Sequence, residues 1–342
     1  MRTFVVPELA DTYIANRIRP VGTSDKNNIL KASELWFECH GPVDTSQIDA
    51  NHLEDFQKFL IKKGYDRRHI NKLVGFIKSV FTWSARKKLV AHSQACELKL
   101  VPALLYSDHI KENPSRVPAK EEDILALLPH LHQQFVDMIL FQMLTGSRPS
   151  EVCGMKVGEI NRDYDGENWI YLPTHHKNKW KGKKRAILLG ESEQKVLAKY
   201  LDGKPAESPV FCNLLRKKEK PITTASYSRM IAETIKKHKL GKFTPYQLRH
   251  SNCTWISRVI DKDHARAQLG HTTTAMTEIY DHSDIDKQKA VIAKRREVGC
   301  TFSRYVAGSL AAAAGEPVGA VRPVPTAVPV LRLYRGEGGD RS

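Results

Sequence analysis

Residues 269–280 read "LGHTTTAMTEIY" and place His271 nine positions before Tyr280. Gly270 is the residue type that commonly ends a helix, so we expect His271 in a turn and Tyr280 at the end of the next short helix. Two interpretations of this tyrosine are open. It packs in the protein interior, or its hydroxyl is a nucleophile in a reaction that the histidine supports.

The charge of the chain favours a polyanionic partner. The 342 residues include 54 Lys and Arg against 38 Asp and Glu, for a formal net charge of +16. Such an excess attracts nucleic acid through phosphate neutralisation and counterion release, although a basic protein without this partner is the alternative. The length predicts two domains, because one hydrophobic core rarely serves a chain of this size.

The cysteine pattern and the N-terminus indicate a protein of the cytoplasm. The six cysteines are widely spaced and form no CxxC pair, which argues against a disulfide framework or a zinc ribbon. The first residues lack a signal-peptide core, and no apolar run reaches the ~18 residues that a membrane helix needs. We therefore expect a soluble cytoplasmic protein without a membrane segment.

Residues 1–105 are predicted to form a helical domain. Apolar residues recur on one helical face in "HLEDFQKFLIKKGYD" (52–66) and again in "INKLVGFIKSVFTWSARKKLV" (70–90). Basic residues occupy the remaining positions, as a solvated helix face or as contacts to a DNA backbone. The candidates for DNA contact in this domain are Arg67, Arg68, Lys72, Lys78, Arg86 and Lys87.

A polar linker at 106–120 precedes a second domain at 121–300. In this domain Pro129 separates two predicted helices, the second apolar nearly all round. Residues 161–190 predict a small antiparallel sheet from "WIYL" and "AILL", with a basic hairpin between them. The expected fold class is mainly α with a small antiparallel β-sheet (α+β). From 301 to 342 the chain is rich in Ala, Gly, Pro and Val, so we expect a tail that is disordered or only locally helical.

Two arginine motifs lie at predicted helix starts. In "TGSRPSEV" (145–152), Ser147 can cap a helix that begins with Arg148, and Glu151 follows one turn later. In "TPYQLRHSNCTW" (244–255), Thr244 and Gln247 form a capping box that places Tyr246 and Arg249 on one helical face. A guanidinium at a helix start suits an anion, although each arginine alone could be a surface residue.

The basic hairpin supplies a third set of cations. "HHKNKWKGKKR" (175–185) must be solvated or lie against phosphate, because its charges repel one another. Its basic side chains are Lys177, Lys179, Lys181, Lys183, Lys184 and Arg185.

Together these residue types suit phosphoryl transfer on DNA. Guanidinium groups bind phosphate oxygens and stabilise the transition state, a lysine can protonate the leaving 5′ oxygen, and a tyrosine can attack phosphorus. The scheme needs no metal and no ATP. The sequence contains neither a glycine-rich phosphate loop nor an evident acidic metal cluster, so we expect no cofactor and no metal.

The order of these motifs resembles that of the tyrosine recombinases, the phage integrase family, over roughly residues 45–300. The resemblance implies a helical core-binding domain that clamps DNA and a catalytic domain that forms a 3′-phosphotyrosine intermediate. It also implies a nucleophile, two phosphate-binding arginines, a general acid with two possible registers, a hydrogen-bonding histidine and a supporting acid. These are Tyr280, Arg148 with Arg249, Lys177 or Lys179, His271 and Glu151.

One position departs from the family pattern, which has histidine where this chain has Tyr246. A phenol with a pKa near 10 accepts a proton poorly at neutral pH but can donate a hydrogen bond to phosphate. We expect retained, slower cleavage, or a tyrosine that only packs at its helix start. Two alternatives to a recombinase are a type IB topoisomerase and a DNA-binding protein that has lost catalysis.

The resemblance implies double-stranded DNA as the partner and a homotetramer on two DNA sites, which would associate the protein with the nucleoid. Lys179 and Lys181 of the hairpin join the candidate DNA contacts. Residues 284–299 could provide the helix exchanged between subunits, with Val291 and Ile292 as its apolar contact.

Overall fold

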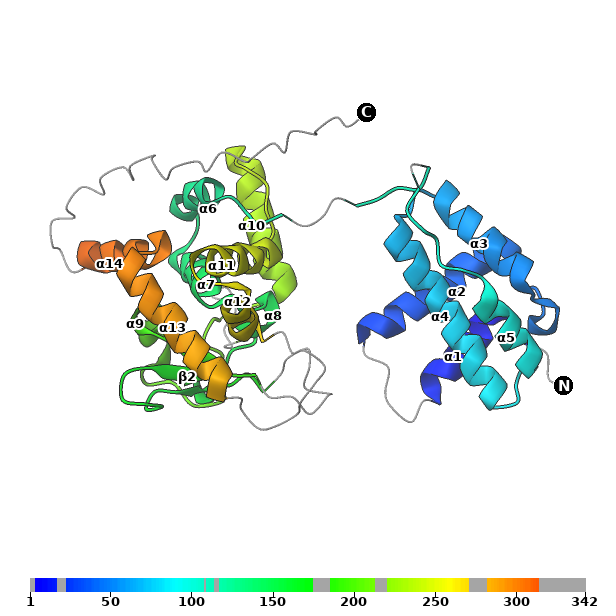
Figure 1. Cartoon of the computed structure of the whole chain (residues 1–342), viewed down its shortest axis with the longest axis horizontal. Coiled ribbons are helices and arrows are strands. Elements are labelled where there is room, and N and C mark those ends of the chain that lie inside the picture. The colour runs from blue at the N-terminus through cyan, green and yellow to red at the C-terminus, as the bar shows by residue number, and fades with distance from the viewer. Residues whose placement is uncertain are drawn as a thin grey trace, which may run out of the picture. The chain divides into compact units, whose positions relative to one another are not determined.

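The computed structural model describes residues 4–16, 23–107, 109–113, 117–174, 185–212, 220–270 and 282–313. The chain divides into two compact units, Met1–Ser115 and Arg116–Ser342 (Figure 1). The division falls within the segment that the sequence predicts as a linker.

The N-terminal unit is helical wherever the structure assigns regular secondary structure. Its helices are α1 (Val6–Ala15), α2 (Thr23–His40), α3 (Ala50–Lys62), α4 (Arg67–Arg86) and α5 (His92–Leu100), with a 3-10 turn at Thr45–Gln47. Helix α4 contacts the other four. Its predicted apolar face is buried in the core, which is why this helix is central. Asp66 caps it by accepting a hydrogen bond from the His69 amide at 3.2 Å.

The C-terminal unit surrounds the buried helix α7. Its helices are α6 (Glu121–Leu127), α7 (Gln133–Thr145), α8 (Pro149–Cys153), α9 (Glu191–Leu201), α10 (Thr224–His238), α11 (Pro245–Val259), α12 (Lys262–Leu269), α13 (His282–Val298) and α14 (Thr301–Ala313). Pro129 lies in the 3-10 turn Leu128–His130 between α6 and α7, where the sequence predicts a break. Helix α7 is buried almost all round, as predicted, and contacts α8, α9, α11 and α14.

The predicted antiparallel sheet is present, with a short additional strand. Its strands are β1 (Ile160–Asn161), β2 (Trp169–Tyr171) and β3 (Ile187–Leu189), in the order β1-β2-β3. Both pairs are antiparallel, and Ile170 lies opposite Leu188. The fold class is therefore confirmed as mainly α with a small antiparallel sheet. Among the described residues, no helix combines the length and apolar character needed to cross a membrane.

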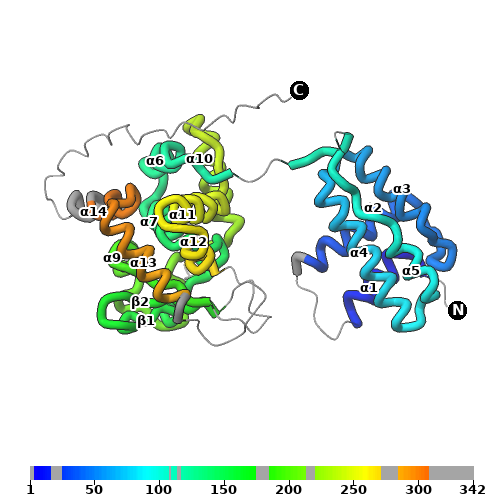
Figure 2. The backbone as a smooth tube through the Cα atoms, in the orientation of Figure 1, coloured from blue at the N-terminus to red at the C-terminus, as the bar shows by residue number. Residues whose placement is uncertain are grey.

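Helix α13 packs on its own chain through Val291 and Ile292, the two residues that the sequence predicts as an apolar contact between subunits. Val291 is buried in a cluster with Ile256 and Ala265. Ile292 lies against Gly190, where an added Cβ would come within 2.7 Å of its Cγ2. Figure 2 shows α13 running alongside α12 and then turning into α14. The two apolar side chains are used for this intramolecular packing.

The C-terminal unit extends past residue 300, where the sequence predicts that the second domain ends. Helix α14 covers Thr301–Ala313, and its side chains Phe302 and Val306 lie in the core of the C-terminal unit. The Ala-rich composition predicts local helix here, but it does not reveal that one face of that helix is buried. The remaining part of the predicted tail, 314–342, lies outside the described residues.

Candidate active site

Arg148 and Glu151 form an ion pair at the start of α8. Arg148, and not Ser147 as predicted, is the N-cap residue. Glu151 accepts hydrogen bonds from the Arg148 amide at 2.8 Å and from its Nη1 at 2.6 Å. Ser147 is buried, and its hydroxyl lies 2.7 Å from the hydroxyl of Thr145. The carboxylate rather than a serine hydroxyl therefore satisfies the helix start.

Glu151 carries a negative charge in a fully buried position. Its side chain is 0% exposed. Burial alone would raise the pKa of this carboxyl, but the charges of Arg185 and Arg148 and the hydrogen bonds from Arg148 hold it below its ordinary value. The carboxylate is thus ionised at neutral pH and holds the Arg148 guanidinium in one orientation.

Arg249 connects the two arginine motifs to the end of α12. The side chain is 3% exposed, donating from Nη1 to the Gly146 carbonyl at 2.6 Å and from Nη2 to the Leu269 carbonyl at 2.8 Å. Burial, together with Arg148 and Arg185, lowers the pKa of its guanidinium to about 10, which still leaves a cation at neutral pH. Segments more than 100 residues apart in sequence meet at this one side chain.

The predicted starts and ends of the flanking helices are confirmed. Helix α11 has Thr244 as its N-cap and Pro245 as its first residue, and Gln247 Oε1 accepts a hydrogen bond from the Thr244 amide at 3.0 Å. Gly270 ends α12 in the left-handed conformation, with φ of 62°. These local signals place Arg249 one turn into α11 and place Leu269 at the end of α12.

Arg185 belongs to this cluster, although the sequence assigns it to the exposed basic hairpin. It is only 6% exposed, and its Nη2 donates to the Gln268 carbonyl at 2.9 Å. All three residues of the following strand, Ile187 to Leu189, are buried, so a residue just before that strand can also lie in the interior. Its location immediately before an apolar strand is therefore the missed signal.

Tyr246 is at the surface beside this cluster. It is 38% exposed, and its ring lies edge-on to the imidazole of His250 with the centroids 5.3 Å apart. Tyr246 and Arg249 are three residues apart on α11, the spacing that places two side chains on one helical face.

The cluster has more positive than negative charge. Arg148, Arg185 and Arg249 surround the carboxylate of Glu151, and Asp284 also acts on Arg185; burial and the neighbouring arginine charges lower the pKa of Arg185 and of Arg249. Preorganised guanidinium groups with an uncompensated charge suit the binding of a phosphate and of the charge that develops during its transfer. Within the described ranges, no group of three or more His, Cys, Asp or Glu side chains is arranged to hold a metal ion.

The other predicted catalytic residues lie outside the described residues. His271 and Tyr280 are in 271–281, and Lys177, Lys179 and Lys181 are in 175–184. The chain nevertheless enters both stretches from the arginine cluster, since one follows Gly270 and the other precedes Arg185.

The predicted DNA contacts of the N-terminal unit divide into two kinds. Arg67 forms an ion pair with Glu112, and Lys78 donates to the Val101 carbonyl, so both have partners within the unit. The other candidates are exposed, namely Arg68, Lys72, Arg86 and Lys87. Lys78 and Arg86 also line a hollow of about 400 Å³, together with Lys99 and Trp83.

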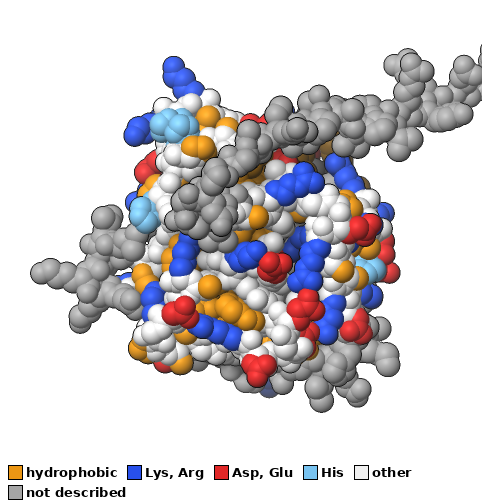
Figure 3. All heavy atoms as spheres, turned by 90° about the vertical axis from the view of Figure 1, so that its left-hand side faces the viewer, with side chains coloured by type: hydrophobic (Ala, Val, Ile, Leu, Met, Phe, Trp, Pro, Cys, Tyr) orange, Lys and Arg blue, Asp and Glu red, His pale blue; other side chains and the backbone are white. Residues whose placement is uncertain are grey.

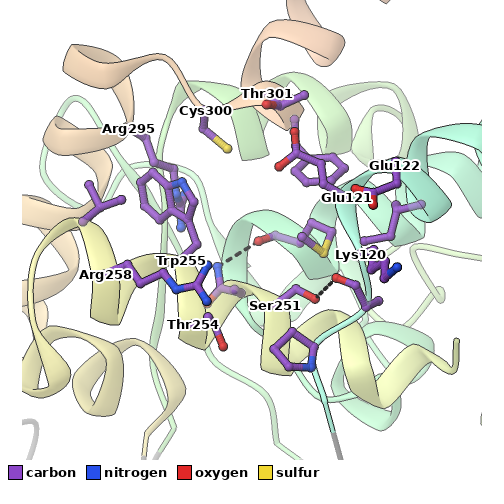
Figure 4. A pocket seen from close by; sticks show the side chains of 17 residues that line it. Lys120, Glu121, Glu122, Ser251, Thr254, Trp255, Arg258, Arg295, Cys300 and Thr301 are labelled. Atoms are coloured by element: carbon purple, nitrogen blue, oxygen red, sulfur yellow. Dashed lines mark hydrogen bonds between the residues drawn. The ribbon is translucent and has the colours of Figure 1, made fainter. Parts of the chain in front are cut away.

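A cavity of about 440 Å³ is lined in part by α11. Figure 4 shows its lining, which includes Ser251, Trp255 and Arg258 of α11 and Arg295 of α13. The Ser251 hydroxyl donates to the Ala119 carbonyl at 2.9 Å and attaches the start of the unit to α11. None of the three clustered arginines lines this cavity, so it is distinct from the candidate active site.

The chain is similar to known proteins in sequence and in structure. Residues 120–287 match the Phage integrase family. The tyrosine recombinase XerA of Pyrococcus furiosus is 27% identical over 232 residues, covering 66% of this chain and 74% of the relative. The tyrosine recombinase XerC of Bacillus pumilus is 25% identical over 243 residues, covering 66% and 73%.

Two solved structures share the fold. The Tn1549 transposon integrase in complex with transposon right end DNA has a TM-score of 0.62 at 18% identity, covering 85% of this chain and 99% of that chain. A lambda integrase tetramer bound to a Holliday junction has a TM-score of 0.60 at 14% identity, covering 82% and 81%. At these identities the likeness establishes the fold only.

Proposed function

Residues 120–287 are a domain of the phage integrase family, and on this premise we propose that the protein is a site-specific tyrosine recombinase. It cleaves and rejoins duplex DNA through a 3′-phosphotyrosine intermediate. The curated relatives are named tyrosine recombinases, which supports the reaction class. The single observation that carries the proposal is the pair of oriented guanidinium groups, Arg148 and Arg249, beside the buried carboxylate of Glu151.

The arginines hold the phosphate and stabilise its transfer. Arg148 is oriented by two hydrogen bonds to Glu151, and Arg249 is oriented by two backbone carbonyls. Guanidinium groups fixed in this way stabilise developing negative charge without reorganising during the reaction. In this proposal Glu151 is a positioning residue, because its contacts are made to Arg148 and not to the DNA.

Tyr280 supplies the nucleophile. Its hydroxyl oxygen attacks phosphorus, the bond from phosphorus to the 5′ oxygen breaks, and the 3′ end remains attached to the tyrosine. Lys177 or Lys179 gives a proton to the leaving 5′ oxygen, and His271 donates a hydrogen bond to a phosphate oxygen. Attack by a 5′ hydroxyl on the phosphotyrosine then rejoins a strand. The bond energy is conserved, so the scheme requires neither ATP nor a metal ion.

Tyr246 is proposed to donate a hydrogen bond to the same phosphate. It lies beside Arg249 and is exposed enough to reach a ligand. We expect Tyr246→Phe to slow cleavage by about tenfold, the usual scale for one hydrogen bond to a charged group. Tyr246→His is expected to match or exceed the wild type, because imidazole can also exchange a proton near neutral pH. A Phe variant as fast as the wild type would leave the hydroxyl without this role.

The N-terminal unit is proposed to bind DNA through its exposed cations, Arg68, Lys72, Arg86 and Lys87. On the face of the C-terminal unit seen in Figure 3, basic side chains are interspersed with acidic ones. Exposed ion pairs of this unit include Arg296 with Glu167 at 2.6 Å and Lys195 with Glu191 at 2.7 Å. A mixed surface attracts a polyanion weakly, so we place the duplex elsewhere on this unit. We further propose that four copies act together on two DNA sites.

The test is a suicide-substrate assay in EDTA and without ATP. Nicked DNA carrying the attachment site, recovered from the flanks of the host element, traps the covalent intermediate because the small fragment diffuses away. We expect a denaturation-resistant protein–DNA adduct that is lost in Tyr280→Phe. Tight binding to this DNA without any adduct would instead support a catalytically silent DNA-binding protein.

A supercoiled plasmid distinguishes recombination from topoisomerase activity. With one attachment site per plasmid, a topoisomerase relaxes the DNA in many turnovers. A recombinase produces exchanged products only when two sites are supplied. Relaxation without exchange on the two-site plasmid would favour the topoisomerase.

A further inference from the structure

Two arginines cap the last carbonyls of α12. Arg185 Nη2 donates to the Gln268 carbonyl at 2.9 Å, and Arg249 Nη2 donates to the next carbonyl, of Leu269, at 2.8 Å. The final carbonyls of a helix have no partner within it and carry partial negative charge, which explains the preference for cations there. The end of α12 is thereby fixed to the segment that enters β3, which carries Arg185, and to α11, which carries Arg249.

Arg185 also fits closely against Gly270. An added Cβ at Gly270 would lie 2.8 Å from Arg185 Nη1, and the glycine has φ of 62°. No hydrogen-bond partner is found for the buried Nε among the residues that the structure describes. The hydrogen bonds of this guanidinium to described protein atoms therefore go to backbone carbonyls and hold a chain segment in place, while the nearby carboxylates of Glu151 and Asp284 offset part of its charge.

The start of α13 is fixed to the same part of β3. Gln288 is 2% exposed, and its Oε1 accepts a hydrogen bond from the Leu188 amide at 2.8 Å. Its Nε2 donates to the Ala186 carbonyl at 3.4 Å, and Arg185 Nη1 donates to that same carbonyl at 3.4 Å. The end of α12 and the first turns of α13 are thus attached to β3 within three residues of each other.

We propose that Arg185 and Gln288 are positioning residues for strand transfer, because they hold the two helix ends between which the chain carries Tyr280. The inference rests on the proposed function. Neither residue needs to touch the DNA. Arg185 is conspicuous because a buried cation is costly, and an apolar side chain of similar volume would fill its place more cheaply. An arginine is needed here because its planar guanidinium can donate to the carbonyls of Gln268 and Ala186 at the same time, which a single ammonium group does less well.

Arg185→Lys keeps the positive charge and removes the planar guanidinium that donates to two carbonyls. We expect cleavage of the suicide substrate to slow by about 10²-fold, the scale for a misplaced reacting group. DNA affinity should stay within about twofold, because the proposed phosphate ligands remain. Arg296→Lys, on the exposed side of α13, is the matched control and should leave the cleavage rate unchanged. Gln288→Met tests the second attachment if the lysine variant fails to fold.

A tyrosine-independent reaction separates positioning from catalysis. In a Tyr280→Phe background, a DNA end with a 3′-p-nitrophenyl phosphate is joined when a 5′ hydroxyl attacks phosphorus and p-nitrophenolate leaves. Arg148→Lys should slow this joining, whereas Arg185→Lys should not. Equal losses in cleavage and joining would make Arg185 a catalytic or purely structural residue and overturn the proposal.

Proteolysis of the free protein tests the attachment without any DNA chemistry. We expect Arg185→Lys and Gln288→Met to speed cutting by a glutamyl endopeptidase after Glu278 by about tenfold or more. Cutting at other glutamates should not change. Unchanged cutting after Glu278 would overturn the proposal. A wild type that forms no adduct while its variants show the faster cutting would contradict the proposed function but not the attachment.

Discussion

Substituting Gly146 by alanine should disturb the fold and the arginine cluster together. Gly146 ends α7 with φ of 66°, and an added Cβ would come within 2.5 Å of Asn252 Oδ1 and 2.7 Å of Leu269 Cδ2. Asn252 cannot easily move away, because its Nδ2 donates to the carbonyls of Met143 and Leu144 at 2.8 and 3.1 Å. The Gly146 carbonyl itself binds Arg249.

The cost has two parts. A left-handed conformation costs an alanine about 1–2 kcal/mol relative to glycine. Displacing Asn252 loses two buried hydrogen bonds, at about 0.5–1.5 kcal/mol each. Gly146→Ala should therefore destabilise the C-terminal unit by about 2–5 kcal/mol. Gly203→Ala is the matched control, because Gly203 has φ of 72° but nothing lies within 4 Å of an added Cβ. Gly203→Ala should therefore cost only about 1–2 kcal/mol, for the left-handed backbone conformation.

Hydrogen exchange followed by mass spectrometry measures each unit separately in the full chain. Peptides from α7 and α11 should lose protection in Gly146→Ala and lose less in Gly203→Ala. Peptides from α4 of the N-terminal unit should remain unchanged in both. Suicide-substrate cleavage should fall in the first variant only. If the two alanine variants lose equal protection, the close approach of Asn252 has no energetic consequence and the reasoning is refuted.

Three further outcomes are expected. Glu193→Gln leaves the buried Arg295 without its carboxylate partner and should lower the free energy of unfolding, measured by urea denaturation, by about 3–5 kcal/mol. The double variant Glu193→Leu with Arg295→Met should recover most of that stability. A loss below about 1 kcal/mol in Glu193→Gln would contradict the expectation. In the folded protein the pKa of Glu151 is held below its value in the unfolded chain, which is about 4.3. The ionised carboxylate therefore stabilises the fold fully above pH ~4.3, and this stabilisation is lost as the pH falls through the lower pKa of the folded state. The stability difference between wild type and Glu151→Gln should shrink on acidification, and a constant difference would argue against a shifted pKa. Finally, Arg68→Gln should reduce the slope of log K for DNA binding against log salt concentration by about one unit. Arg67→Gln should leave this slope unchanged, because Arg67 is already paired with Glu112. Equal effects of the two substitutions would show that the ion pair opens on DNA.

Features set by neighbouring residues were predictable from the sequence. The apolar face of α4, the break at Pro129, the Gly270 end of α12 and the strands around residues 170 and 188 follow from periodicity and turn chemistry. The N-cap at Arg148 was missed by one position, because Glu151 competes with Ser147 for the role of capping group. Such signals act over a few residues and do not depend on the rest of the fold.

The partner of each charged side chain was decided by the tertiary structure. Arg185 looked like one more cation of a hairpin, yet it bonds a carbonyl 83 positions away. Val291 and Ile292 looked available to another subunit, yet they pack on α11, α12 and Gly190. The sequence by itself determined which helices form and which residue types are present for phosphoryl transfer. Only the fold determined which arginines converge, because burial and charge pairing depend on segments that the chain brings together from a hundred residues apart.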